Sequence, residues 1–144
     1  IGYVEYAYAK QNKMAYTQLK NAAGNFVQPS AESFAAAGNA DWKGTPGFNI
    51  VLTNQADPNA WPISAATFIL VHTKPTNPEN VKNTLKFFDW AYSSGDELAK
   101  SLDFVPFSAE SKAIFREEWK KVVGADGKPL FSSDAATATA SAAK

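Results

Sequence analysis

The sequence predicts an α/β chain that is incomplete on its own, and three patterns carry this prediction. One apolar run of strand length, Phe68–Val71, suits burial on both faces of a sheet. A series of well-punctuated helices follows between Asn77 and Gly124, and these helices carry many large aromatic side chains. Only about four strands are recognisable, two of them in a small hairpin. So few strands cannot cover the aromatic face of the helices, which indicates that most of the sheet lies outside this sequence.

The composition excludes several classes of function. The chain has 144 residues, of which 45% are hydrophobic and 13% aromatic, so it is long enough to bury a core. Lys and Arg number 14, as do Asp and Glu, so no net charge would attract nucleic acid or an acidic membrane surface. The absence of cysteine excludes thiol catalysis and a disulfide framework. No apolar run approaches the roughly 20 residues that span a bilayer.

The first part of the chain predicts a strand, a helix and a hairpin. Residues 1–4 have the apolar character of a buried strand, and Glu5–Asn12 follows as a short helix. Partial alternation over Ala15–Lys20, with a turn at Gly24-Asn25 before Phe26-Val27, predicts the hairpin. Because no initiator Met precedes the first strand, we expect the chain to be part of a longer protein.

A second helix and an irregular segment come next. Ser30 has the character of an N-cap, Glu32 lies near the positive end of the helix dipole, and Gly38 ends the helical run. Residues 38–60 are rich in Gly, Asn, Asp and Pro. We therefore expect an irregular path there, with one short helical or extended piece near Phe48–Leu52.

The strongest strand signal covers Trp61–Thr73, since Pro62 can begin a strand and the residues after it are β-branched and aromatic. Asn77-Pro78-Glu79 then predicts the start of a helix that Gly95 ends. Four apolar residues recur on one face of this helix, namely Val81, Leu85, Phe88 and Tyr92.

Two further helices and a tail complete the prediction. Asp96–Leu102 predicts a short helix, and Ser108 caps a last helix that ends at Gly124. Its apolar face consists of Phe115, Trp119 and Val122. Pro129–Phe131 is expected to be extended. Ser132–Lys144 contains almost only Ala, Ser and Thr, so we expect residues 132–144 to form a flexible tail.

No constellation of residues predicts catalysis or a metal site. His72 is the only histidine, and without a second His, a Cys or an adjacent acid a structural role is favoured over a metal ligand or general base. Glu117-Glu118 and Asp96-Glu97 are adjacent pairs that point about 100° apart on a helix, so we interpret them as solvated faces. We therefore expect no enzyme, no cofactor and no metal.

The tyrosines near the start of the chain allow two interpretations. Interleaved aromatic residues can stack on bases or sugars, but no basic residues surround these ones in their strand-to-helix setting. Packing in a core or an interface is therefore favoured for Tyr3, Tyr6 and Tyr8.

Several segments follow one another at a characteristic spacing: Ile1–Asn12, Leu52–Gln55, Trp61–Ile63, Thr67–His72, Leu85–Tyr92 and Gly127–Leu130. In that order they closely resemble the C-terminal portion of the periplasmic phosphate-binding protein of the bacterial phosphate ABC importer, from Ile1 to about Phe131. The resemblance implies part of a two-lobe, type II-like α/β binding protein with the anion in its cleft. The family's phosphate contacts, including a Ser-Gly-Thr turn preceded by Arg, lie upstream of Ile1, so no phosphate-binding residue is expected in this chain.

The same resemblance implies a division of the chain. Residues 1–63 would be the C-terminal part of the second lobe, and residues 69–131 the C-terminal part of the first. Residues 64–68 would cross between the lobes, with hinge positions that absorb backbone rotation at Ser64, Ala65, Thr67 and Phe68.

The resemblance also implies a function, partners and a location. The chain is interpreted as a fragment of the periplasmic component that captures inorganic phosphate and delivers it to the permease, with this part giving lobe scaffold and hinge. The expected partners are phosphate, bound with the missing N-terminal half, and the ABC permease subunits in the inner membrane. We also expect pairing with that half or self-association, because the aromatic face needs a cover. The alternative is an autonomous structural or interaction module without a transport role, and an enzyme ranks third for want of a catalytic constellation.

Overall fold

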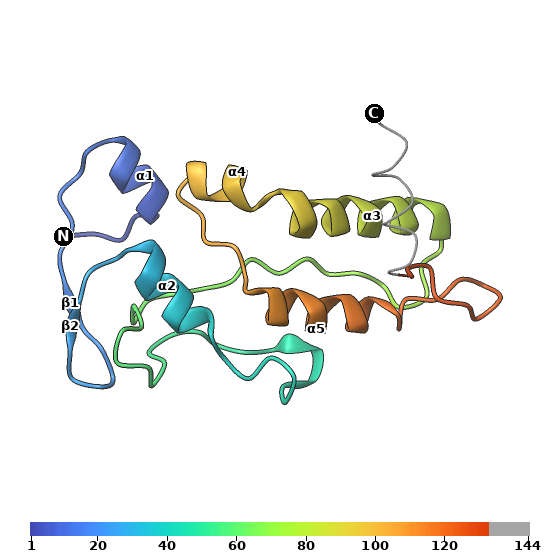
Figure 1. Ribbon diagram of the computed structural model, residues 1–144, viewed down its shortest axis with the longest axis horizontal. Helices are drawn as coiled ribbons and strands as arrows, with labels where there is room; N and C mark the ends of the chain where they lie inside the picture. Colours follow the sequence, from blue (N-terminus) through green and yellow to red (C-terminus); the bar gives the residue numbers. More distant parts are fainter. Residues whose placement is uncertain (133–144) are drawn as a thin grey trace. The chain divides into compact units, whose positions relative to one another are not determined.

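The computed structural model describes residues 1–132 and divides them into two compact units. Unit 1 comprises Ile1–Thr67 and Glu97–Ser108, and unit 2 comprises Phe68–Asp96 and the chain from Ala109 onward. The chain therefore passes between the units three times, and Figure 1 shows its path along the sequence. Apart from Ser132, the expected tail lies outside the described residues.

Unit 1 contains short elements joined by irregular segments. They are α1 (Tyr6–Gln11), β1 (Leu19–Lys20), β2 (Phe26–Val27), α2 (Ala31–Gly38) and the 3-10 helix η1 (Pro46–Phe48). The predicted hairpin is confirmed: β1 and β2 are antiparallel, with Leu19 opposite Val27. The turn between them uses Gly24 at φ +88°, a conformation that glycine adopts without steric cost.

The predicted N-cap of α2 is also confirmed. The hydroxyl oxygen of Ser30 accepts a hydrogen bond from the Ser33 backbone N–H at 3.2 Å, and the Ser33 hydroxyl oxygen accepts one from the Ser30 N–H at 3.0 Å. This is a capping box in which Ser33 takes the place of the usual Glu or Gln. One N–H of the first helical turn, that of Ser33, and the N–H of the N-cap residue Ser30 are thereby satisfied.

A buried amide connects the hairpin to the irregular segment. The side-chain NH2 of Asn21 donates to the carbonyls of Pro58 and Ala60 at 2.8 and 3.2 Å, and its Oδ1 accepts from the Asn25 N–H at 3.0 Å. The buried apolar residues of unit 1 are Ala7, Ala9, Ala37, Trp42, Leu52, Ala60 and Trp61. Irregular backbone is therefore held by polar contacts as well as by burial.

Two predicted strands are not formed. Residues 1–4 were expected to be a buried strand, but all four are exposed. Within Trp61–Thr73, no residue is in a strand, and Leu70 is 95% exposed. The only sheet in the described part of the chain is the pair β1–β2. Within the described residues, neither residues 1–4 nor Trp61–Thr73 has a neighbouring strand to pair with. An unpaired strand cannot bury its backbone polar groups, because they would have no hydrogen-bond partners.

Unit 2 is built on α3 (Pro78–Ser94) and α5 (Ala109–Trp119), which pack against each other (Figure 1). The predicted start of α3 is confirmed, since the Asn77 side chain accepts from the Asn80 N–H at 3.1 Å and Pro78 is the first helical residue. The helix ends before Gly95, as predicted. In contrast, α5 ends at Trp119 and does not reach Gly124. The short α4 (Asp96–Ser101) follows after Gly95, and its residues from Glu97 onward belong to unit 1.

The core of unit 2 lies around the fully buried Leu85 of α3. Val122 and Phe131 are buried against it, and the half-buried residues that surround them are Val71, Val81, Trp119 and Leu130. The Val123 N–H donates to the Thr73 carbonyl at 2.8 Å. Hydrophobic burial is thus accompanied by a backbone hydrogen bond between segments far apart in the sequence.

Leu85→Ala tests this core. Because Leu85 is 0% exposed, we expect a loss of about 2–5 kcal/mol in the free energy of unfolding, from lost transfer energy and the cavity left behind. The measurement is urea unfolding followed by circular dichroism. The matched control is Leu98→Ala, a helical leucine that is 59% exposed, for which a change within about 0.5 kcal/mol is expected. Equal effects of the two substitutions would contradict the assignment.

Candidate functional site

The expected hinge residues lie beside the point where the chain first leaves unit 1. The boundary between the units falls between Thr67 and Phe68. Ser64 is buried, and its hydroxyl donates to the Trp61 carbonyl at 2.9 Å. Ala65, Thr67 and Phe68 are exposed. The segment is therefore anchored at Ser64 and open to solvent beyond it, and its side chains do not converge on a binding site.

The only arginine of the chain makes structural contacts inside unit 2. Arg116 Nε donates to Asp89 Oδ1 at 2.6 Å, and its Nη2 donates to the Ser93 hydroxyl at 2.9 Å. Its guanidinium also lies 5.7 Å from the centre of the Tyr92 ring. Asp89 is 7% exposed. The guanidinium already contacts a carboxylate, a hydroxyl and an aromatic ring, so it is not arranged to bind a free anion.

A buried lysine makes a second ion pair in unit 2. Lys112 Nζ donates to both carboxylate oxygens of Asp96, at 2.5 and 2.6 Å, and to the Tyr92 carbonyl at 3.2 Å. Its side chain is 7% exposed. Asp96 was expected on a solvated face, and its side chain is 44% exposed, but it also serves as the partner of this lysine, since an ammonium that is removed from water recruits a carboxylate.

Both ion pairs have a signal in the sequence. Asp89 follows Leu85 by four residues, and Lys112 precedes Phe115 by three, so each polar residue lies on the apolar face of its helix. Polar groups on a buried face need partners. Glu117 keeps the surface role expected of it and pairs with Lys120 three residues later.

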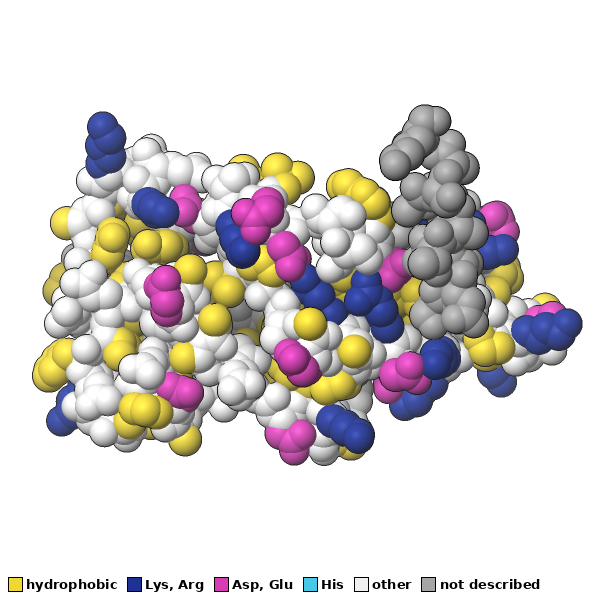
Figure 2. Space-filling model, viewed as in Figure 1, with side chains coloured by type: hydrophobic (Ala, Val, Ile, Leu, Met, Phe, Trp, Pro, Cys, Tyr) yellow, Lys and Arg dark blue, Asp and Glu magenta, His cyan; other side chains and the backbone are white. Residues whose placement is uncertain are grey.

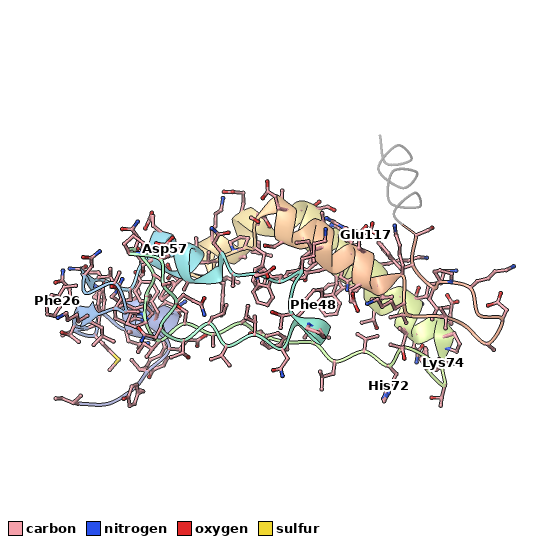
Figure 3. The ribbon with its side chains drawn as sticks, turned by 90° about the horizontal axis from the view of Figure 1, so that it is seen from below. Phe26, Phe48, Asp57, His72, Lys74 and Glu117 are labelled. Atoms are coloured by element: carbon pink, nitrogen blue, oxygen red, sulfur yellow. The ribbon has the colours of Figure 1, made fainter. Side chains whose placement is uncertain are left out.

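The remaining candidates do not form a site in the described residues. His72 is exposed, and Figure 3 shows its side chain pointing away from the helices. No group of three or more His, Cys, Asp or Glu side chains within residues 1–132 could hold a metal ion. Of the early tyrosines, Tyr6 packs edge-on against Tyr16 and Phe34. The core interpretation is wrong for Tyr3 and Tyr8, which are exposed.

The face of the molecule drawn in Figure 2 does not present one dominant charge. On the face shown in Figure 2, Lys and Arg side chains are interspersed with Asp and Glu. Within residues 1–132, no helix combines the length and the apolar character that a bilayer crossing requires.

Comparison with curated proteins identifies the class to which this chain is related, that of phosphate-binding proteins. Over 121 residues, 83% of the chain, it is 52% identical to "Phosphate-binding protein PstS" of Haemophilus influenzae, covering 36% of that protein. Over 133 residues, 91% of the chain, it is 50% identical to PstS of Pasteurella multocida, covering 39% of it. Over 107 residues, 74% of the chain, it is 54% identical to PstS of Xylella fastidiosa, covering 29% of it. No family model matches the chain.

These matches confirm the resemblance inferred from the sequence. The chain is a homologue of the PstS phosphate-binding proteins over most of its own length. It spans between 29% and 39% of the length of these three relatives.

The Arg116 cluster generates a pH prediction. Burial raises the pKa of Tyr92, and the nearby Arg116 opposes this only in part. A raised folded-state pKa means that folding favours the protonated phenol, so its contribution is intact below the ordinary tyrosine pKa of about 10 and is lost as the pH rises above it.

We therefore expect wild type to lose stability relative to Tyr92→Phe between about pH 9.5 and 11. The measurement is the free energy of unfolding in urea across this range. Tyr3→Phe, at an exposed position, is the matched control and should follow wild type. Parallel curves for wild type and Tyr92→Phe would contradict this account.

Proposed function

We propose that this chain is the C-terminal part of the phosphate-binding component of an ABC-type phosphate importer. The observation that carries the proposal is the identity of 50–54% with PstS proteins over 74–91% of the chain. In this role the chain supplies lobe scaffold and hinge. The working location is the periplasm, and the partners are inorganic phosphate, bound with the upstream half, and the permease subunits in the inner membrane.

The two units are proposed to belong to the two lobes of the binding protein. Unit 1 would contribute to the second lobe and unit 2 to the first, with the passage near Thr67 as a hinge. This differs in one segment from the division expected from the sequence, because Glu97–Ser108, expected in the first lobe, groups with unit 1. Ser64 supports this assignment because its hydrogen bond fixes the backbone just before the passage, while Thr67 itself is exposed. Rotation can then concentrate in a few exposed residues.

Phosphate is proposed to bind through groups that this chain does not supply. An anion leaves water only where several aimed donors replace its hydration. The guanidinium of Arg116 already serves Asp89 and Ser93, and the ammonium of Lys112 already serves Asp96. Binding without catalysis is the proposed activity, in keeping with the relatives' printed name.

The proposal predicts weak phosphate binding by this chain alone and tight binding by a chimera that also contains the upstream part of a relative. By isothermal titration at low salt, the 144-residue chain should bind phosphate no better than about millimolar. A chimera carrying the upstream part of the Haemophilus influenzae relative before Ile1 should bind phosphate at about micromolar affinity or better. Titration with chloride is the control for nonspecific anion binding.

Two outcomes would overturn the proposal. Micromolar binding by the chain alone would locate a phosphate site within it. A folded chimera without phosphate binding would favour the autonomous interaction module, in which the chain serves no transport role. The fold of the chimera is checked separately by circular dichroism and cooperative unfolding.

The proposed hinge leads to a prediction for Thr67, a residue that is not proposed to contact phosphate. In the chimera, Thr67→Pro should weaken phosphate binding about tenfold or more, because proline fixes φ and removes a backbone donor where rotation is needed. Ala65→Ser, at an exposed neighbouring position, is the control and should bind normally. Unchanged affinity of the Thr67→Pro variant, with unchanged compaction on phosphate addition by small-angle scattering, would rule out the hinge.

A further inference from the structure

The segment Glu97–Ser108, here called the strap, leaves unit 2 and returns to it. It follows Asp96 of unit 2, belongs to unit 1 throughout, and re-enters unit 2 at Ala109. Its residues include most of α4. The strap therefore adds two further passages between the units to the one near Thr67, and its contacts within each unit determine what it can do.

Lys112 holds the base of the strap inside unit 2. Asp96 is the last residue before the strap, and Lys112 lies one helical turn after the return point. The Lys112 ammonium contacts both Asp96 oxygens and the Tyr92 carbonyl. One buried cation thus joins the departing and the returning backbone, and removal of either charge leaves the other without its partner.

The departure itself is constrained by Gly95. The Gly95 N–H donates to the Ala91 carbonyl at 2.8 Å. A Cβ at this position would lie 2.6 Å from the Ala91 carbonyl oxygen, so only glycine fits without a backbone shift. The backbone between α3 and α4 therefore has a defined path where the strap begins.

The strap is also anchored within unit 1. After α4, the Phe104 N–H donates to the Ala99 carbonyl and the Asp103 N–H to the Lys100 carbonyl, each at 3.0 Å, which is the pattern of a Schellman cap. Asp103 takes the left-handed position at φ 64° and pairs through its carboxylate with Lys10. Phe107 packs edge-on against the buried Trp42, with ring centres 5.4 Å apart.

We propose that the strap is a conformational coupling element between the two units and that Lys112 is its latch. Two units joined by a single chain segment can rotate freely about that segment. Three connecting segments, two of them held together at their ends by Lys112, restrict this rotation. Lys112 acts as a positioning residue, by keeping the two ends of the strap together. The inference depends on contacts inside each unit and is independent of phosphate.

Hydrogen exchange of the complete chain tests the latch. In Lys112→Met, which keeps an apolar stem without the charge, we expect amides of residues 97–104 to exchange on the order of tenfold faster, with the middle of α3 unchanged within about twofold. Lys121→Met, which removes a surface lysine paired with Glu118, is the matched control. Asp96→Asn removes the other charge of the pair and should accelerate exchange in the same way. If Lys112→Met does not fold, Asp96→Asn serves as the test variant.

Coupling is measured separately from local stability. The native sequence has no cysteine, so spin labels at Ala35→Cys in unit 1 and Asn83→Cys in unit 2, both at exposed positions, report the spread of distances between the units. The latch variant should broaden this distribution, and Lys121→Met should not. An unchanged distribution, unchanged exchange over 97–104, or equal acceleration across α3, α5 and the strap would each overturn the proposal.

Discussion

Extended backbone needs a neighbouring strand to satisfy its hydrogen bonds, and this requirement constrains the chain more than any single side-chain contact does. A helix satisfies its N–H and C=O groups within itself, but a strand depends on another segment for the same bonds. Within residues 1–132, only β1 and β2 pair with each other. Residues 1–4 and the run Phe68–Leu70 are therefore exposed despite their apolar sequence, while the predicted helices form, with α5 ending at Trp119 and not at Gly124.

The two units are stabilised by different interactions. Unit 1 has short elements, and it depends on edge-on aromatic pairs such as Phe34 with Trp61 and on the buried amide of Asn21. Unit 2 has longer helices, and two ion pairs supplement the burial of Leu85: Arg116–Asp89 joins α5 to α3, and Lys112–Asp96 joins α5 to the first residue of α4. Each pair has one buried member, Lys112 and Asp89, and these favour one arrangement of the helices because a shifted helix would leave a buried charge without its partner.

The sequence predicted what local chemistry determines. The caps at Ser30 and Asn77, the turn at Gly24 and the apolar face around Leu85 all depend on residues within a few positions of one another. The partner of Lys112 and the inclusion of Glu97–Ser108 in unit 1 depend on contacts between distant segments. No local pattern specifies such contacts, and the strands failed for the same reason, since strand pairing is non-local.

The central claim is that Phe68–Leu70, which is not in a strand in this structure, pairs as a strand when the upstream part of a phosphate-binding protein is present. Hydrogen exchange of these amides, compared between the 144-residue chain and the chimera with the upstream part of the Haemophilus influenzae relative, tests it most directly. The account predicts fast exchange in the chain alone and protection greater by a factor of about 100 or more in the chimera. Equal exchange rates in the two proteins, with the chimera folded, would contradict it.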